Sequence, residues 1–201
     1  SSYVTIQEGC DKFCAFCVVP FTRGPEYSRS IKSIVDESKS LIDRGSKEIV
    51  LLGQNVNAYN YKDQKNIVYN ISKLIDEVSK LDNIKRIRYT TSHPNNMDLE
   101  LIKLHGSNEK LMPFLHLPVQ SGSNEILKKM NRKYNVDEYK KIIDQLKLYK
   151  PNIETSSDFI VGFPGETDED FESTLKLVRE IKFLQSYSFK YSPRPGTPGV
   201  L

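Results

Sequence analysis

Short apolar runs alternate with longer segments of helical periodicity along the whole chain. Residues 48–52 (EIVLL) form a short run of the kind that is buried in a parallel sheet. Residues 31–44 carry apolar side chains at helical spacing, and Gly45 is placed to end that helix. The predicted strands cover residues 3–7, 48–52, 84–91, 114–117, 153–161 and 186–191. The predicted helices cover residues 31–44, 67–81, 98–105, 123–130, 136–149 and 168–182.

This alternation predicts an α/β fold with parallel strands, because repeated strand–helix–strand units require right-handed crossovers between parallel strands. A closed (β/α)8 barrel typically needs about 250 residues, and this chain has 201. We therefore expect a partial (β/α)6 TIM-like barrel, with parallel strands inside and helices outside. Residues 55–66, which are rich in Asn and Lys, are expected to form a surface loop.

The carboxyl ends of the predicted strands carry the most unusual segments of the sequence. Active sites of barrel folds lie at this end of the strands. After the cysteines that follow the first strand, these segments are Gly53-Gln54-Asn55, Ser92-His93-Pro94, Gln120-Ser121-Gly122 and Gly162-Phe163-Pro164-Gly165. We expect them to meet at one rim of the barrel.

Composition describes a globular protein with 38% hydrophobic and 27% charged residues. A net charge of +3 and a pI near 8.6 are compatible with a nucleic-acid partner but do not argue for one. No apolar run approaches the roughly 20 residues that span a bilayer, and no signal-peptide pattern opens the chain. We expect a cytoplasmic protein without a membrane partner.

All three cysteines fall in one loop, as Cys10, Cys14 and Cys17 with the spacing C-x3-C-x2-C. An odd, clustered set is a poor disulfide framework and indicates a reducing compartment. Three thiolates could hold a structural zinc ion if a histidine or carboxylate completed the tetrahedron, although no histidine has ligand-like spacing. They could also hold an iron–sulfur cluster with one iron left open, which would indicate an enzyme.

The cysteine run resembles the signature of the radical S-adenosylmethionine superfamily, and residues 10–24 resemble its methylthiotransferase family. The resemblance covers the whole chain, with further matching segments at residues 52–59, 90–94, 116–123 and 158–167. Residues 53–59 favour the branch that modifies tRNA adenosine. The resemblance implies that residues 1–201 are the radical core domain. It also implies that an N-terminal domain with a second 4Fe–4S cluster and a C-terminal RNA-binding domain are absent from this chain.

The resemblance implies that Cys10, Cys14 and Cys17 bind a 4Fe–4S cluster whose fourth iron binds S-adenosylmethionine. Reductive cleavage would give a 5′-deoxyadenosyl radical for C2 methylthiolation of N6-isopentenyladenosine next to the tRNA anticodon. The implied partners are the tRNA anticodon stem-loop and a flavodoxin- or ferredoxin-like electron donor. One alternative is a sister methylthiotransferase acting on threonylcarbamoyl-adenosine or a ribosomal-protein aspartate. An alternative of another class is a zinc-stabilised RNA-binding module.

The same resemblance assigns seven residues to the cofactor: Phe16, Gly53, Gln54, Ser92, Gln120, Arg132 and Asp158. Phe16 would lie against the adenine, Gly53 and Gln54 near the methionyl amino group, Arg132 near the carboxylate and Asp158 near the ribose hydroxyls. His93 and His116 are expected to have structural roles.

Three expectations concern groups around this site. Arg23 and Arg29 flank the cysteine loop and are expected near its mouth. Residues 128–134 form a basic patch, with Lys128, Lys129, Arg132, Lys133 and Tyr134, that is best interpreted as a solvated helix face. Thr167 is expected to cap the last helix in an imperfect capping box with Asp170.

Overall fold

Six parallel strands form the centre of the protein in the computed structural model, which describes residues 1–200. One three-stranded sheet has the order β1 (Ser2–Thr5), β4 (Glu48–Leu52) and β7 (Arg86–Tyr89). The other has the order β8 (Phe114–His116), β9 (Glu154–Val161) and β10 (Gln185–Lys190). Every neighbouring pair in the two sheets is parallel. Ile87 of β7 also forms a parallel bridge with Leu111, just before β8, so the strands follow one another in chain order.

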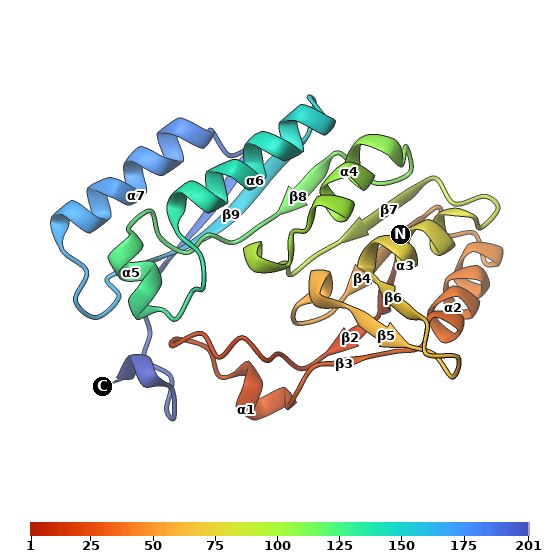
Figure 1. The fold of residues 1–201 in the computed structure, drawn as a ribbon, viewed down its shortest axis with the longest axis horizontal. Helices are drawn as coiled ribbons and strands as arrows, with labels where there is room; N and C mark the ends of the chain where they lie inside the picture. The colour runs from red at the N-terminus through yellow and green to blue at the C-terminus, as the bar shows by residue number, and fades with distance from the viewer. Residues whose placement is uncertain (201) are drawn as a thin grey trace.

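Helices cover one face of this strand layer (Figure 1). The covering helices are α2 (Ile31–Asp43), α3 (Ile71–Ser79), α4 (Leu99–Ser107), α6 (Val136–Tyr149) and α7 (Asp168–Ile181). The shorter α1 (Val19–Arg23) and α5 (Asn124–Lys129) lie beside the loops at one end of the strands (Figure 1). The predicted partial (β/α)6 barrel of parallel strands with outer helices is therefore confirmed.

Alternation along the strands divides their side chains between a core face and an open face. Val4, Ile49, Leu51, Ile87 and Leu115 are completely buried and belong to the large core cluster that the helices complete. Burying a side chain of this size contributes roughly 1.5–3 kcal/mol. The residues between them point the other way, because successive strand side chains alternate between faces. This open face carries mainly polar and aromatic side chains, together with Val50.

Polar residues fix where the helices begin. Ser30, Asn70, Asp98 and Asn135 each accept a backbone N–H of the first turn of the helix that follows, a contact worth about 1 kcal/mol. At α7, Thr167 and Asp170 form both bonds of a capping box, so the expected cap is complete.

The structure corrects two predicted boundaries. The first strand ends at Thr5, and β2 (Gln7–Glu8) pairs antiparallel with β3 (Tyr27–Ser28). The helix predicted from residue 67 begins at Ile71, because β5 (Asn60–Lys62) and β6 (Val68–Asn70) form an antiparallel hairpin. The Asp63 carboxylate accepts the backbone N–H groups of Lys65 and Ile67 and closes this hairpin. Part of the predicted surface loop is therefore strand.

Three short 3-10 turns complete the described part of the chain: η1 (Val56–Ala58), η2 (Pro94–Asn96) and η3 (Pro198–Val200). Across residues 1–200, no helix combines the length and apolar character needed to cross a bilayer.

A buried histidine gives the domain a predictable pH dependence. His105 is 1% exposed, its Nε2 lies 2.7 Å from the Tyr89 hydroxyl, and burial lowers its pKa to about 4. The unfolded chain takes up this proton near pH 6.5, so the folded state loses stability as the pH falls from 6.5 towards 4. Between pH 7 and pH 5 this histidine alone should cost about 2 kcal/mol of unfolding free energy.

Urea unfolding of wild type and His105→Phe at both pH values tests this expectation. The variant should lose that part of the pH dependence, whereas Tyr89→Phe, which keeps the imidazole, should retain most of it. Equal pH dependence in wild type and His105→Phe would show that His105 does not titrate in this way.

Candidate active site

A buried glutamine anchors the start of the cysteine loop to the turn after β4. Gln7 is completely buried, and its Oε1 accepts the backbone N–H groups of Gln54 and Asn55, each at 3.0 Å. Its Nε2 donates to the carbonyl of Gly9 at 2.7 Å, and Gly9 N–H donates to Gln54 Oε1 at 2.7 Å. A Cβ at Gly53 would lie 2.6 Å from Gln7 Oε1, so only glycine permits this approach. Gly53 and Gln54 therefore support the cysteine loop directly.

The segment after α5 holds the other side of the cysteine loop. Ala15 N–H donates to the carbonyl of Met130 at 3.0 Å, and Asn131 Nδ2 donates to the carbonyl of Phe13 at 2.8 Å. Arg132 Nη1 lies 3.4 Å from the sulfur of Cys14. Regions of the chain more than a hundred residues apart thus meet at the cysteines.

Arg132 is buried, which corrects its interpretation as part of a solvated surface patch. Its guanidinium donates to the carbonyl of Pro118 at 2.7 Å and to the hydroxyl of Tyr134 at 2.8 Å, and Tyr134 is buried as well. Lys128, Lys129 and Lys133 are exposed and remain on the surface. The sequence pattern missed this because the partners of Arg132 come from distant segments.

The two arginines expected near the mouth of the site differ in their surroundings. Arg29 donates to the carbonyl of Thr5 at 2.5 Å and pairs with Glu37 at 2.7 Å, so it ties β1 to α2. Arg23 is exposed at the end of α1, beside the cysteine loop. Of the pair, the described contacts leave Arg23 as the one at the surface.

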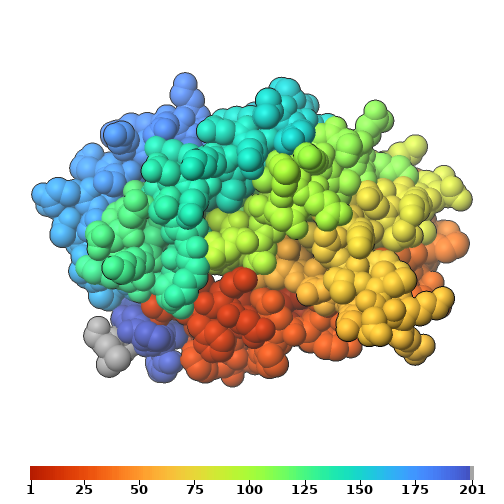
Figure 2. All heavy atoms as spheres, viewed as in Figure 1, coloured from red at the N-terminus to blue at the C-terminus, as the bar shows by residue number. Residues whose placement is uncertain are grey.

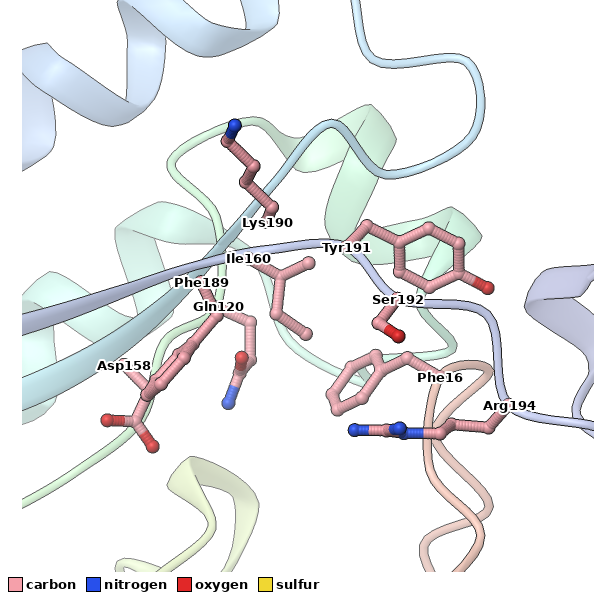
Figure 3. A pocket seen from close by; sticks show the side chains of 9 residues that line it. All are labelled: Phe16, Gln120, Asp158, Ile160, Phe189, Lys190, Tyr191, Ser192 and Arg194. Carbon is pink, nitrogen blue, oxygen red and sulfur yellow. The ribbon is translucent and has the colours of Figure 1, made fainter.

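A cavity of about 330 Å³ brings together three residues that the sequence assigned to a cofactor (Figure 3). Phe16 reaches it from the cysteine loop, Gln120 from the segment after β8, and Asp158 from β9. The other lining residues are Ile160, Phe189, Lys190, Tyr191, Ser192 and Arg194. Asp158 and Gln120 lie on one side of the cavity, whereas Phe16 and Arg194 lie on the other (Figure 3).

Gln120 adopts a backbone conformation that is unusual for a residue with a side chain. Its φ is +77°, in the left-handed region, where a non-glycine residue costs of the order of 1–3 kcal/mol. Its N–H donates to the carbonyl of Asp158, and its own carbonyl accepts from Ile160 N–H, both at 2.9 Å. These two bonds hold Gln120 against β9 and direct its side chain into the cavity (Figure 3).

The cavity suits a nucleoside that carries charged or polar groups. Phe16 and Ile160 offer apolar surface for a planar base, while Asp158 offers a carboxylate that accepts hydrogen bonds from hydroxyl groups. Arg194 supplies a positive charge on the opposite side (Figure 3).

The family model of the Radical SAM superfamily matches residues 4–178. The chain belongs to the radical SAM superfamily. Curated relatives named tRNA-2-methylthio-N(6)-dimethylallyladenosine synthase include one from Anaplasma phagocytophilum (strain HZ), which is 61% identical over 202 residues. Another, from Rickettsia akari (strain Hartford), is 59% identical over 200 residues. Both alignments cover 100% of this chain and 45% of the relative, so the chain spans less than half their length.

Solved structures with low sequence identity share the radical SAM fold. The radical S-adenosylmethionine methyltransferase TsrM from Kitasatospora setae has a TM-score of 0.77 at 18% identity, covering 98% of this chain and 38% of that one. Coproporphyrinogen III oxidase from Escherichia coli has a TM-score of 0.62 at 20% identity, covering 96% of this chain and 44% of that one.

Membership of the radical SAM superfamily implies a 4Fe–4S cluster and S-adenosylmethionine, and the cysteine loop offers a suitable donor set. The three thiols are free, with Cys14 buried and the other two partly exposed. Burial raises the pKa of the Cys10 and Cys17 thiols, and bound iron would oppose this shift because it would stabilise the thiolate. Within residues 1–200, no three His, Cys, Asp or Glu side chains converge as ligands of one metal ion. Three cysteines that hold an iron–sulfur cluster need not converge on a single ion, because each binds the cluster through its own thiolate.

Sequence reasoning missed the part of this candidate site that follows β10. Tyr191, Ser192 and Arg194 line the cavity, and Gly199 N–H donates to the carbonyl of Ala15 at 2.8 Å in the cysteine loop. The dark-blue segment that ends at residue 200 accordingly lies beside the red segment near the start of the chain in the space-filling view (Figure 2). This segment has no helical or strand periodicity. Its Pro and Gly residues directly after a barrel strand could have indicated a loop of the site, since loops at that end of the strands build active sites.

Ser92 and His93 are not among the residues that line the cavity. Ser92 is buried, and its hydroxyl has no hydrogen-bond partner within residues 1–200. His93 accepts the N–H of Asn95 through Nδ1 and packs edge-on against Tyr134, with its pKa lowered to about 2 by burial. The contacts of His93 are structural, and a cofactor contact from Ser92 remains a prediction.

Proposed function

We propose that residues 1–201 are the catalytic core of a tRNA methylthiotransferase that modifies C2 of N6-isopentenyladenosine next to the anticodon. The observation that carries the proposal is the 61% identity over the whole chain to a curated synthase whose name gives this product. The proposed partners are a tRNA anticodon stem-loop and a flavodoxin- or ferredoxin-like electron donor in the cytoplasm. A second 4Fe–4S cluster would be supplied by sequence outside these 201 residues.

In this proposal Cys10, Cys14 and Cys17 hold the 4Fe–4S cluster. When bound, the cluster and S-adenosylmethionine supply the electron transfer and radical chemistry of the superfamily. The protein's own task is to fix the loop that carries the thiols. Gln7 and Arg132 do this from opposite sides, through the turn after β4 and the segment after α5.

The cavity residues bind and orient the nucleoside part of S-adenosylmethionine in this proposal. Phe16 packs against the adenine, and with Ile160 it keeps water from the base. Asp158 accepts hydrogen bonds from the ribose hydroxyls, and Gln120 is fixed beside it by its bonds to β9. Arg194 lies opposite Asp158 and is suited to an anionic group.

An anaerobic assay of the 201-residue chain and of the whole protein tests the function. We expect the reconstituted chain to bind about four irons and to cleave S-adenosylmethionine without forming methylthio-adenosine. The whole protein should methylthiolate a stem-loop that carries isopentenyladenosine.

Control substrates separate the sister activities. Unmodified and threonylcarbamoylated stem-loops, and the ribosomal-protein acceptor, should remain unchanged. Product from one of these in place of the isopentenylated stem-loop would assign the chain to a sister enzyme. A colourless protein with one zinc ion and no cleavage would overturn the proposal.

A further inference from the structure

Three polar side chains form a chain across two strands on the open face of the barrel. His116 of β8 is the register partner of Ser156 of β9, and its Nδ1 lies 2.8 Å from the Ser156 hydroxyl. Its Nε2 lies 3.4 Å from Oδ2 of Asp158, two residues further along β9 and therefore on the same face. The order Ser156–His116–Asp158 leads from a buried hydroxyl to a carboxylate that lines the cavity.

The chemistry of these groups fixes their orientation. A carboxylate only accepts hydrogens, so the neutral tautomer that suits both neighbours has its hydrogen on Nε2 towards Asp158 and accepts from the Ser156 hydroxyl at Nδ1. Ser156 is 1% exposed, so water does not compete for this bond. The ring therefore has a polar neighbour at each nitrogen, Ser156 at Nδ1 and Asp158 at Nε2.

A third strand supports the same ring. Tyr187 of β10 is the register partner of Asp158, and its ring packs edge-on against His116 with centroids 6.2 Å apart. The side chains of His116 and Asp158 are 21% and 28% exposed, so both reach the open face while their backbones lie within the sheet. Within residues 1–200, the second oxygen of Asp158, Oδ1, takes part in no hydrogen bond or ion pair and remains for a ligand.

We propose that His116 is a positioning residue that holds the Asp158 carboxylate towards the nucleoside cavity. Fixing one carboxylate oxygen before the ligand arrives removes an ordering cost from binding. The group that benefits is a vicinal diol, which donates two hydrogen bonds to a carboxylate. The inference rests on the proposed function, because it assumes that Asp158 receives the ribose of S-adenosylmethionine.

Ligand binding to the anaerobically reconstituted protein tests this role without relying on turnover. The probes are S-adenosylhomocysteine and its 2′,3′-dideoxy analogue, with Kd measured by equilibrium dialysis. His116→Phe keeps a ring against Tyr187 but loses both polar contacts, and it should raise the Kd of S-adenosylhomocysteine about tenfold. His116→Gln keeps a donor for Asp158 and should stay within about threefold of wild type. The dideoxy analogue should bind wild type and His116→Phe equally.

A double-mutant cycle then shows whether His116 acts through Asp158. In an Asp158→Ala background, His116→Phe should change the Kd less than about twofold, because coupled residues are not additive. A full tenfold loss in that background, or no loss from His116→Phe alone, overturns the positioning role. Wild-type affinity in Asp158→Ala would overturn both this inference and the assignment of Asp158 in the proposed function. Thermal melts of each variant verify that the loss does not come from unfolding.

Discussion

Replacing Cys14 with alanine is expected to remove the iron–sulfur cluster and, with it, all cleavage of S-adenosylmethionine. Anaerobically reconstituted wild type should carry about four irons per chain, and Cys14→Ala should carry fewer than about one. The chain has three cysteines in all, so no fourth thiol can take the place of Cys14. Iron analysis, visible absorption and the formation of 5′-deoxyadenosine measure the effect.

Two further variants separate the ligand role of Cys14 from its packing. Cys14→Ser keeps an acceptor for the buried Arg132, whereas Cys14→Ala removes one of its partners at a cost of about 1 kcal/mol. Serine should therefore preserve the unfolding free energy but restore little iron. Lys12→Ala is the matched control, since Lys12 lies in the same loop and makes no side-chain hydrogen bond or ion pair within residues 1–200. Wild-type iron content in Cys14→Ala would show that the cluster is held elsewhere.

The order of strands and helices could be predicted because each element buries one face. A helix such as residues 31–44 shows its apolar positions at helical spacing, and β4 is a continuous apolar run, so local pattern reports tertiary burial. The apolar pattern gave the wrong start for the helix predicted at residues 67–81. Residues 67–70 continue its helical spacing but belong to the hairpin. The Asp63 turn and the Asn70 cap decide that boundary, and both are side-chain contacts with the backbone that periodicity does not contain.

The cavity was predictable only in part, for a related reason. The family resemblance assigned Phe16, Gln120 and Asp158 to the cofactor. The rule that loops at the carboxyl ends of barrel strands meet at one rim explains why Phe16 and Gln120 lie in one cavity, whereas Asp158 reaches it from within β9. Arg194 lies in a segment without periodicity, so nothing local placed it in the same cavity. Arg132 lies 118 residues from Cys14, and its burial depends on that contact and on Pro118. Such long-range pairing of polar groups leaves no periodic trace in a single sequence.

A Gly9→Ala substitution is expected to disrupt the cysteine loop far more than Gly24→Ala, although the two glycines share a positive φ. Gly9 has φ +73°, and an added Cβ would lie 2.0 Å from the carbonyl oxygen of Pro25 and 2.5 Å from that of Gly24. Gly24 has φ +76°, but an added Cβ there meets nothing within 4 Å. Both variants carry backbone strain of about 1–3 kcal/mol. Only Gly9→Ala adds a clash, and the atoms it clashes with belong to the backbone, which cannot move aside as the end of a flexible side chain can.

The position of Gly9 turns this clash into a test of the site. Gly9 N–H and C=O bond to Gln54 and Gln7, and Cys10 N–H donates to the carbonyl of Gly24 at 3.2 Å. Relief of the clash therefore moves the segment after β2, which contains Gly9, away from the segment before β3, which contains Gly24. This movement displaces Cys10. We expect Gly9→Ala to lose more than about 3 kcal/mol of unfolding free energy and most of its iron. Gly24→Ala should lose about 1–3 kcal/mol and keep its cluster. Urea unfolding and iron analysis of both variants measure this difference. Equal losses of unfolding free energy and of iron in the two variants would show that the loop accommodates the added Cβ at Gly9 without displacing the cluster ligands.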